Sequence, residues 1–192
     1  MGKKITGNLG SSNLLNMFDY SNIIHGGSVS GSNYSYSSSP LHGKSQPYQE
    51  QYSVYSKMKR KDIKHGVYNA KNGGYQKNPT AQRLDSMVKG NYIVGKTYNK
   101  QVPYVISTDG KVIIGDRNGN GKTPSKTPTP HPTLIGGKDP KVKMAGILDI
   151  RGGKIYSYDD RSGHYRPNSE SMKWADEAFK NYPKHKHFKG GK

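Results

Sequence analysis

The chain has 192 residues, a formal net charge of +18 at pH 7 and a hydrophobic content of only 30%. This composition allows one domain with a small core, and the excess of basic residues favours an anionic partner, most commonly nucleic acid, over a merely solvated surface. The chain has no cysteine, which excludes disulfides, thiolate zinc sites and a cysteine nucleophile, and no apolar run reaches the roughly 20 residues that a membrane-spanning helix needs.

Residues 1–56 are rich in Ser, Gly, Asn and Tyr, with the run GSVSGSNYSYSSSP at their centre. Such a segment buries too little apolar surface to offset its ordering entropy, so we expect a long disordered arm. The short apolar stretch LLNMF at 14–18 could dock on a secretion carrier, and the spaced tyrosines could stack on bases or wrap a protein. Because MGKK at the start is not followed by an apolar region, we expect secretion by a route other than Sec.

Basic residues dominate from residue 57 onward, where KMKRKDIKHGVYNAKNGGYQK interleaves lysines with aromatic residues. This pattern suits contact with phosphates combined with stacking on bases, although a flexible basic linker has the same composition. Asn78 and Pro79 then predict the start of a short helix over TAQRLDSMVK, which Gly90 would end. We therefore assign residues 57–89 to a basic linker that contains one short helix.

A first β-hairpin is predicted at 102–115, around the turn signal Asp109-Gly110. The segment after it, DRNGNGKTPSKTPTPHP, resembles a phosphate-binding loop, but its prolines forbid the helix that would hold the phosphate. It also matches the first half of a calcium loop, although the twelfth position is Thr127 where a glutamate is required. We expect an ordinary Asn/Gly turn followed by an extended, proline-rich crossover.

A second hairpin and a final helix enclose a polar loop. The strands at 142–150 and 154–158 alternate apolar and polar residues and are joined by Gly152-Gly153. The loop SGHYRP follows at 162–167, and then a helix that Asn168 or Ser169 can cap. We therefore expect an α+β domain at 90–184, with a small antiparallel sheet of two β-hairpins packed on one or two helices, followed by a basic tail at 185–192.

Two histidines lie in the loops that flank this second hairpin, His131 before it and His164 after it. Two imidazoles that titrate near pH 7 can divide general-base and general-acid work, as in metal-independent RNA cleavage. We therefore predict catalytic roles for His164, His131, Tyr165 and Ser162, substrate binding by Arg161, Arg166, Lys138 and Thr133, and no metal or cofactor. The alternative is that His164 makes a structural hydrogen bond that fixes its loop, while His131 is exposed.

Two other functions stay open at this point. In ADP-ribosyl transfer, a histidine and a tyrosine hold NAD while an acidic residue stabilises the oxocarbenium ion. His164 and Tyr165 could fill the first two roles, and Asp149, Asp159 or Asp160 the third. The chain could instead be a non-enzymatic protein that binds nucleic acid or threads its arm through a particle.

Residues 131–183 resemble the C-terminal toxin modules of bacterial polymorphic toxins of the Rhs and contact-dependent types. The shared elements are HPTLIGG, AGILDIRGGKIYSYDDRSGHYRPN and SMKWADEAFKNYP. The matching positions are His131, Thr133, Ser162, His164, Tyr165 and Arg166. The resemblance implies a toxin or effector that is delivered to the cytoplasm of a target cell and has a cognate immunity protein. Because no long Rhs region accompanies the module, we expect a free-standing cargo effector or an isolated toxin module.

Overall fold

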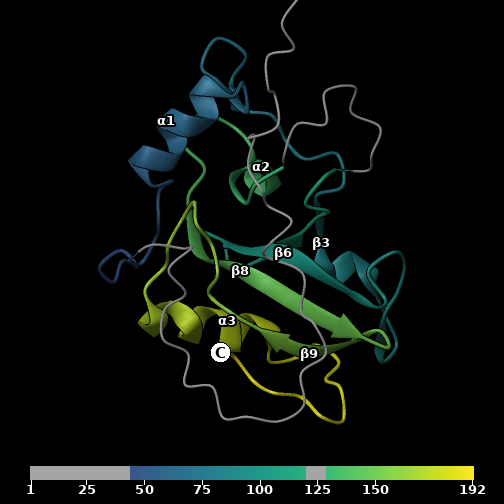
Figure 1. Cartoon of the computed structure of the whole chain (residues 1–192). Helices are drawn as coiled ribbons and strands as arrows, with labels where there is room; N and C mark the ends of the chain where they lie inside the picture. The colour runs from purple at the N-terminus through teal and green to yellow at the C-terminus, as the bar shows by residue number, and fades with distance from the viewer. Residues whose placement is uncertain (1–43, 120–128) are drawn as a thin grey trace, which may run out of the picture. The chain divides into compact units, whose positions relative to one another are not determined.

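The computed structural model describes residues 44–119 and 129–192 of the chain (Figure 1). The arm expected at 1–56 lies outside the described residues as far as residue 43, and so does the part of the proline-rich crossover at 120–128. The described residues have the expected α+β fold. They are organised around a five-stranded antiparallel sheet with the strand order β3-β7-β6-β8-β9, accompanied by two small two-stranded sheets.

The two predicted hairpins form most of this sheet. Their strands are β6 (Lys100–Ser107), β7 (Val112–Ile114), β8 (Val142–Arg151) and β9 (Lys154–Tyr158). The hairpins join where β6 pairs with β8 along almost its whole length. Between β8 and β9, Gly152 and Gly153 have φ angles of +56° and +68°. Glycine adopts such angles without strain, so the Gly-Gly pair favours the tight turn.

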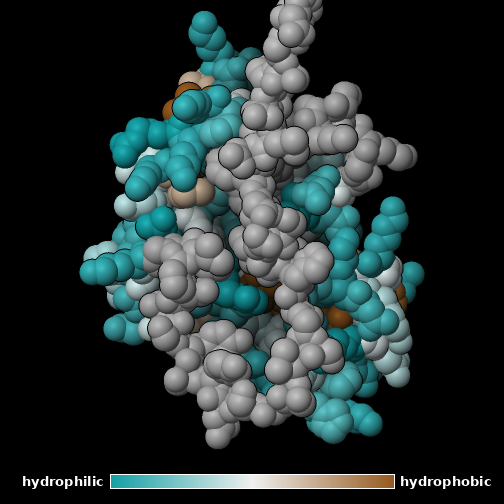
Figure 2. Space-filling model, viewed as in Figure 1, coloured by the Kyte–Doolittle hydropathy of each residue, from teal (hydrophilic) through white to brown (hydrophobic). Residues whose placement is uncertain are grey.

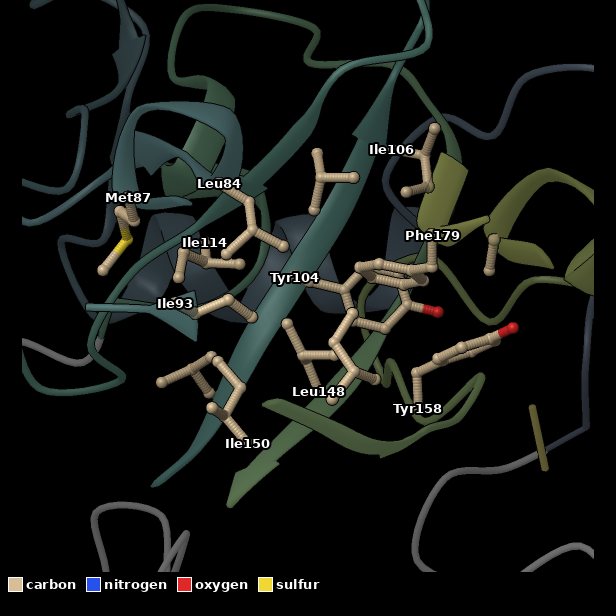
Figure 3. Close-up of a cluster of buried hydrophobic side chains, with 14 of the residues drawn as sticks. Leu84, Met87, Ile93, Tyr104, Ile106, Ile114, Leu148, Ile150, Tyr158 and Phe179 are labelled. Atoms are coloured by element: carbon tan, nitrogen blue, oxygen red, sulfur yellow. The ribbon is translucent and has the colours of Figure 1, made fainter. Parts of the chain in front are cut away.

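One face of the sheet packs against α3 (Met172–Phe179). The ring of Phe179 lies 5.1 Å from that of Tyr104 on β6 and 4.6 Å from that of Tyr158 on β9, measured between centroids. Figure 3 shows these three rings together, with Leu148 beside them on β8. The expected packing of a helix on the hairpins is therefore an aromatic cluster, and such contacts contribute beyond simple area burial.

The last helix begins where the sequence predicts. The side chain of Asn168 accepts a hydrogen bond of 3.0 Å from the backbone N–H of Glu170, and this caps the short 3-10 turn η4 (Ser169–Ser171) that leads into α3. Ala175 and Phe179, which lie four residues apart and therefore on one face of the helix, are fully buried. Capping and apolar periodicity are local patterns, and here both hold in the folded chain.

A second core lies on the opposite face, because neighbouring residues of a strand, such as Tyr104 and Val105, point to opposite sides. It collects residues from both halves of the chain, namely Tyr52, Val54, Val67, Tyr68, Tyr75, Val105, Leu134, Val142, Ala145 and Tyr165. The elements on this side are α1 (Ser56–Lys64), β1 (Tyr68–Asn69), β2 (Gly74–Tyr75) and α2 (Pro132–Ile135). In Figure 1, α1 and α2 lie on the side of the sheet away from α3.

The folded unit therefore begins well before the boundary expected at residue 90. Tyr52 is fully buried, and Tyr75 is nearly so. Residues 57–89, expected as a basic linker, instead provide one helix and part of a core. The sequence does not predict this contribution to the core, because the buried tyrosines and valines are spaced too irregularly to form a periodic apolar stripe.

The helix predicted over TAQRLDSMVK is not formed. This stretch contains the short strand β3 (Gln82–Arg83), the 3-10 turn η3 (Leu84–Met87) and the strand β4 (Val88–Lys89), which pairs with β5 (Tyr92–Ile93). Leu84 and Met87 are buried, as one face of a helix would be, but a 3-10 turn brings residues three apart onto one side equally well. The pairing of β3 with β7 competes with a helix that is too short to be stable alone.

The basic tail at 185–192 runs beside the edge strand β9. The backbone N–H of His185 donates to the carbonyl oxygen of Ile155 at 2.9 Å, and that of Lys192 donates to Tyr158 at 3.0 Å. The tail is therefore held by backbone hydrogen bonds along the sheet. Within residues 44–119 and 129–192, no helix is long and apolar enough to cross a membrane.

Candidate nucleic-acid interface

His164 is buried in the second core, with only 4% of its surface exposed. Its Nε2 atom lies 3.2 Å from Oδ2 of Asp62, a residue of α1 that is itself 2% exposed. The hydroxyl of Tyr75 donates to the same carboxylate at 2.6 Å. Burial, followed by this hydrogen bond, raises the pKa of Tyr75 well above its usual value. The three side chains form a closed polar network, as buried polar groups require.

His131 is also buried, with only 4% of its surface exposed. The alternative to catalysis expected His131 to be exposed, and that expectation is wrong. Its Nε2 donates to the carbonyl oxygen of Gly146 on β8 at 2.9 Å. His131 and His164 therefore hydrogen-bond to different partners, and the structure gives neither ring an open face toward a substrate. A general acid or base must come within hydrogen-bonding reach of the group it serves, so this arrangement does not supply the catalytic pair that the sequence predicted.

The remaining predicted catalytic side chains fix the loop. The Ser162 hydroxyl accepts from the backbone N–H of Tyr165 at 3.3 Å, and the Tyr165 hydroxyl donates to the carbonyl oxygen of Pro140 at 3.1 Å. Burial raises the pKa of Tyr165. Thr133, predicted to bind substrate, is buried and donates to the carbonyl oxygen of Pro130 at 2.7 Å. These contacts explain the residue types of the motif through local structure.

The acidic residues considered for ADP-ribosyl transfer have other contacts. Asp149 forms an ion pair of 2.8 Å with Arg151, and Asp159 pairs with Arg161 while accepting from the backbone N–H of Ile147. Burial, and then the neighbouring charge of Asp159, raise the pKa of Asp160. The carboxylate that does contact His164 is Asp62, 102 positions away in the sequence. The sequence gives no signal for this contact, because Asp62 is a single acidic residue within a run of basic ones.

Asp62 orients the basic helix α1. It is the only buried residue of this helix, and Ile63 beside it is 53% exposed. This reverses the usual amphipathic arrangement, in which apolar residues face the core. The basic residues of α1 are Lys57, Lys59, Arg60, Lys61 and Lys64. Lys59 is half-buried and the other four are exposed, and Figure 2 shows the region of α1 as mostly hydrophilic.

Two of the predicted substrate-binding residues lie beside α1. The Lys59 ammonium donates to the backbone carbonyl oxygen of Lys138 at 3.0 Å, which brings the exposed Lys138 next to the helix. The Arg166 guanidinium lies 4.2 Å from the ring centroid of Tyr55, the residue just before α1. Arg161 is instead paired with Asp159. The exposed Asp139, adjacent to Lys138, adds one negative charge at this edge.

Arg166 has an unusual backbone. Its φ angle of +46° is left-handed, and it is the only residue other than glycine in the described ranges with a positive φ. Side chains rarely adopt this region, which costs energy unless the surroundings hold it. Here the backbone N–H of Arg166 donates to the carbonyl oxygen of Ser162 at 2.7 Å. The carbonyl oxygen of Arg166 accepts from the backbone N–H of Gln46 at 2.8 Å. The loop thereby directs a cation toward the N-terminal end of α1.

We call the exposed residues of α1, together with Lys59, Lys138 and Arg166, the α1 surface. It is a cationic surface with tyrosine rings beneath two of its cations, since Lys59 lies 4.8 Å from the ring centroid of Tyr68. Such cation–π contacts hold long side chains in place. Across the two described ranges, no group of three or more His, Asp or Glu side chains could hold a metal ion.

The fold and this surface define a basic α+β protein with an exposed cationic helix. Comparison of the chain with protein-family models, with curated proteins and with solved structures gave no match. The resemblance of residues 131–183 to polymorphic toxin modules therefore stays a prediction.

Proposed function

We propose that the protein binds nucleic acid, with RNA as the favoured ligand, through the α1 surface. The observation that carries this proposal is the orientation of α1, whose single acid is buried while four of its five basic residues are exposed. A helix that presents several lysines and an arginine is suited to phosphates. The charge of +18 makes a polyanion the natural partner.

This mode of binding is independent of base sequence. Contacts between cations and phosphates supply affinity and register but carry no sequence information. They also release counterions, so affinity falls steeply as salt rises. For contacts of this kind alone, dissociation constants of roughly 10⁻⁴ to 10⁻⁶ M at physiological salt are typical.

In a cell, we propose that this activity belongs to a toxin or effector that reaches the cytoplasm of a target cell, where RNA is available. This part of the proposal is supported by the resemblance of residues 131–183 to polymorphic toxin modules. A cognate immunity protein would then present an acidic surface complementary to α1, since charge complementarity gives such pairs speed and specificity.

Burial of the two histidines weighs against the enzymatic alternatives. Both RNA cleavage and ADP-ribosyl transfer at the SGHYRP loop need side chains that a substrate can reach, whereas His131, His164 and Tyr165 are each at most 4% exposed. Binding needs no such access. We therefore place the non-enzymatic nucleic-acid-binding function first.

The direct experiment measures the binding of a fluorescein-labelled single-stranded RNA by anisotropy over a range of salt concentrations. The triple variant Lys57→Ala/Arg60→Ala/Lys64→Ala should bind at least tenfold more weakly. Its plot of log affinity against log salt should be shallower by roughly 2, since each single-strand phosphate contact contributes about 0.7. Alanine preserves the helix, so the fold should be retained.

The matched control is Lys111→Ala/Lys180→Ala/Lys186→Ala, which removes the same charge from exposed positions outside the α1 surface. It should lose much less affinity than the α1 variant. Equal losses would mean that only total charge matters and would reject the α1 surface as the binding site. In the same samples, RNA that stays intact on a denaturing gel supports binding without cleavage. Shortened RNA would instead favour RNA cleavage as the function.

A further inference from the structure

Two exposed tyrosines lie at the β8–β9 turn. Among the described residues, the large hydrophobic side chains that are exposed are Ile63, Tyr92 and Tyr98, at 53%, 46% and 45%. Ile63 belongs to the α1 surface. The two tyrosines belong to another place, the segment at 88–100 that packs against the turn between β8 and β9. Exposed aromatic rings near cations indicate a contact surface when their positions are fixed.

Backbone hydrogen bonds fix the chain at this turn. The N–H of Ile93 donates to the carbonyl oxygen of Gly153 at 2.7 Å, and the N–H of Gly153 donates to that of Tyr98 at 2.8 Å. The N–H of Gly152 donates to the side chain of Asn99 at 2.6 Å. The segment that carries the tyrosines is therefore held at several points, and its backbone needs little further ordering to bind a ligand.

The rings themselves have defined neighbours. Tyr98 lies so close to Gly153 that a Cβ atom there would be 2.7 Å from its Cε2 atom, so the glycine makes room for the ring. The Lys154 ammonium lies 5.0 Å from the ring centroid of Tyr92. Tyr92 also faces Lys89 across the β4–β5 pair. Both tyrosines thus flank the same turn while nearly half of each side chain faces solvent.

The charge around these rings is positive. The segment 88–100 contains Lys89, Lys96 and Lys100 and no acidic residue. Lys100 forms an ion pair with Asp116, and Arg151 forms one with Asp149, so these two cations are partly neutralised. Lys89 and Lys96 are exposed and Lys154 is half-buried. The turn therefore combines two aromatic faces with three cations.

We propose that this tyrosine patch, consisting of Tyr92, Tyr98, Lys89, Lys96 and Lys154, binds unpaired nucleotides of a single-stranded nucleic acid. Unpaired bases stack on the two rings while the lysines contact the flanking phosphates. A duplex keeps its bases stacked on one another and offers no free face to the rings. This inference rests on the proposed function and adds the class of ligand, a single strand.

The test compares Tyr92→Ala/Tyr98→Ala with Tyr92→Phe/Tyr98→Phe, which keeps both rings. Affinity is measured by anisotropy for a single-stranded oligouridylate and for an RNA duplex of equal length, with circular dichroism as the check of folding. The alanine variant should lose at least about fivefold in affinity for the single strand and less than twofold for the duplex. The phenylalanine variant should bind both ligands like the wild-type protein.

Other outcomes separate this inference from the proposed function. If the alanine variant binds the single strand normally, or loses equally on both ligands, the tyrosine patch is rejected while the α1 surface keeps its own test. If wild-type protein binds neither ligand, both fail. If the wild-type protein binds vesicles of anionic phospholipid through these tyrosines and no RNA, the ligand class is wrong. If the double alanine variant does not fold, Tyr92→Ala alone decides the question, because Tyr98 is the ring that packs on Gly153.

Discussion

The SGHYRP loop and the helix α1 exchange the roles that their sequences suggest. The loop combines a histidine, a serine and a tyrosine, which is typical of a reactive site, yet these side chains are buried and hydrogen-bonded within the protein. Helix α1 has the composition of a flexible linker, yet it has a fixed orientation and an exposed cationic face. Asp62 and His164 link the two, so the loop acts as the support and the helix as the surface that a partner can reach.

Removing Asp62 should break this arrangement most severely. Asp62→Ala leaves His164 and the Tyr75 hydroxyl without their shared partner in the core, and each buried polar group left unsatisfied typically costs about 1 to 3 kcal/mol. Urea denaturation measures the free energy of unfolding. The control Glu177→Ala removes an exposed acid and should change it by less than about 0.5 kcal/mol. If both variants were equally stable, the network would not hold α1.

His164→Ala is expected to lower the free energy of unfolding, so it does not by itself test a catalytic role. It leaves the Asp62 carboxylate buried beside only one donor, so loss of activity in this variant would reflect loss of structure as readily as loss of chemistry. If expression of the chain is toxic, as proposed, toxicity and stability should therefore fall together. A variant that stays as stable as the wild-type protein but loses toxicity would instead favour a catalytic role for His164.

A smaller effect is expected from Tyr75→Phe. The change removes one hydroxyl that donates to Asp62 at 2.6 Å and leaves the buried ring in place. The loss of one hydrogen bond to a buried charged group typically costs about 1.5 to 3 kcal/mol. The same denaturation measurement should show a decrease smaller than that for Asp62→Ala. A larger decrease would make Tyr75, and not the carboxylate, the centre of the network.

The smallest effect concerns Asp160, at the start of the loop. Its pKa is raised by burial, so the charged form is disfavoured in the folded protein compared with the unfolded chain. Its contribution is therefore most favourable below the unfolded pKa of about 3.9 and is lost as pH rises through the folded value. Asp160→Asn should slightly stabilise the protein at pH 7, and the gain should shrink toward pH 4 in parallel denaturation curves. A gain that is independent of pH would point to a cause other than charge.

The parts of the fold that the sequence predicted correctly are those specified by local patterns. The β6–β7 and β8–β9 hairpins follow from alternation and turn residues, and α3 from Asn168 and its apolar stripe. The failures involve long-range contacts. Asp62 meets His164 across 102 positions, and β3 replaces a predicted helix because Gln82 pairs with Ile114. A single sequence carries no local signal for such pairings.

The candidate site divides in the same way. The sequence predicts Lys138 and Arg166 as substrate-binding cations, and the structure places both beside α1. The prediction for His131 and His164 rests on residue type, which does not reveal that both rings are buried. The tyrosine patch was missed because its parts, at 88–100 and at 151–154, are brought together only by hydrogen bonds such as that between Gly153 and Tyr98.

The C-terminal segment beside β9 has a consequence for assembly. An uncovered edge strand offers free N–H and C=O groups to strands of other molecules, which leads to aggregation. Here the outer groups of β9 are bonded to residues 183–192, and at the opposite edge β3 is only two residues long. The β9 edge is thereby covered and the β3 edge is short, so neither side of the sheet offers a long template for the addition of strands from other molecules.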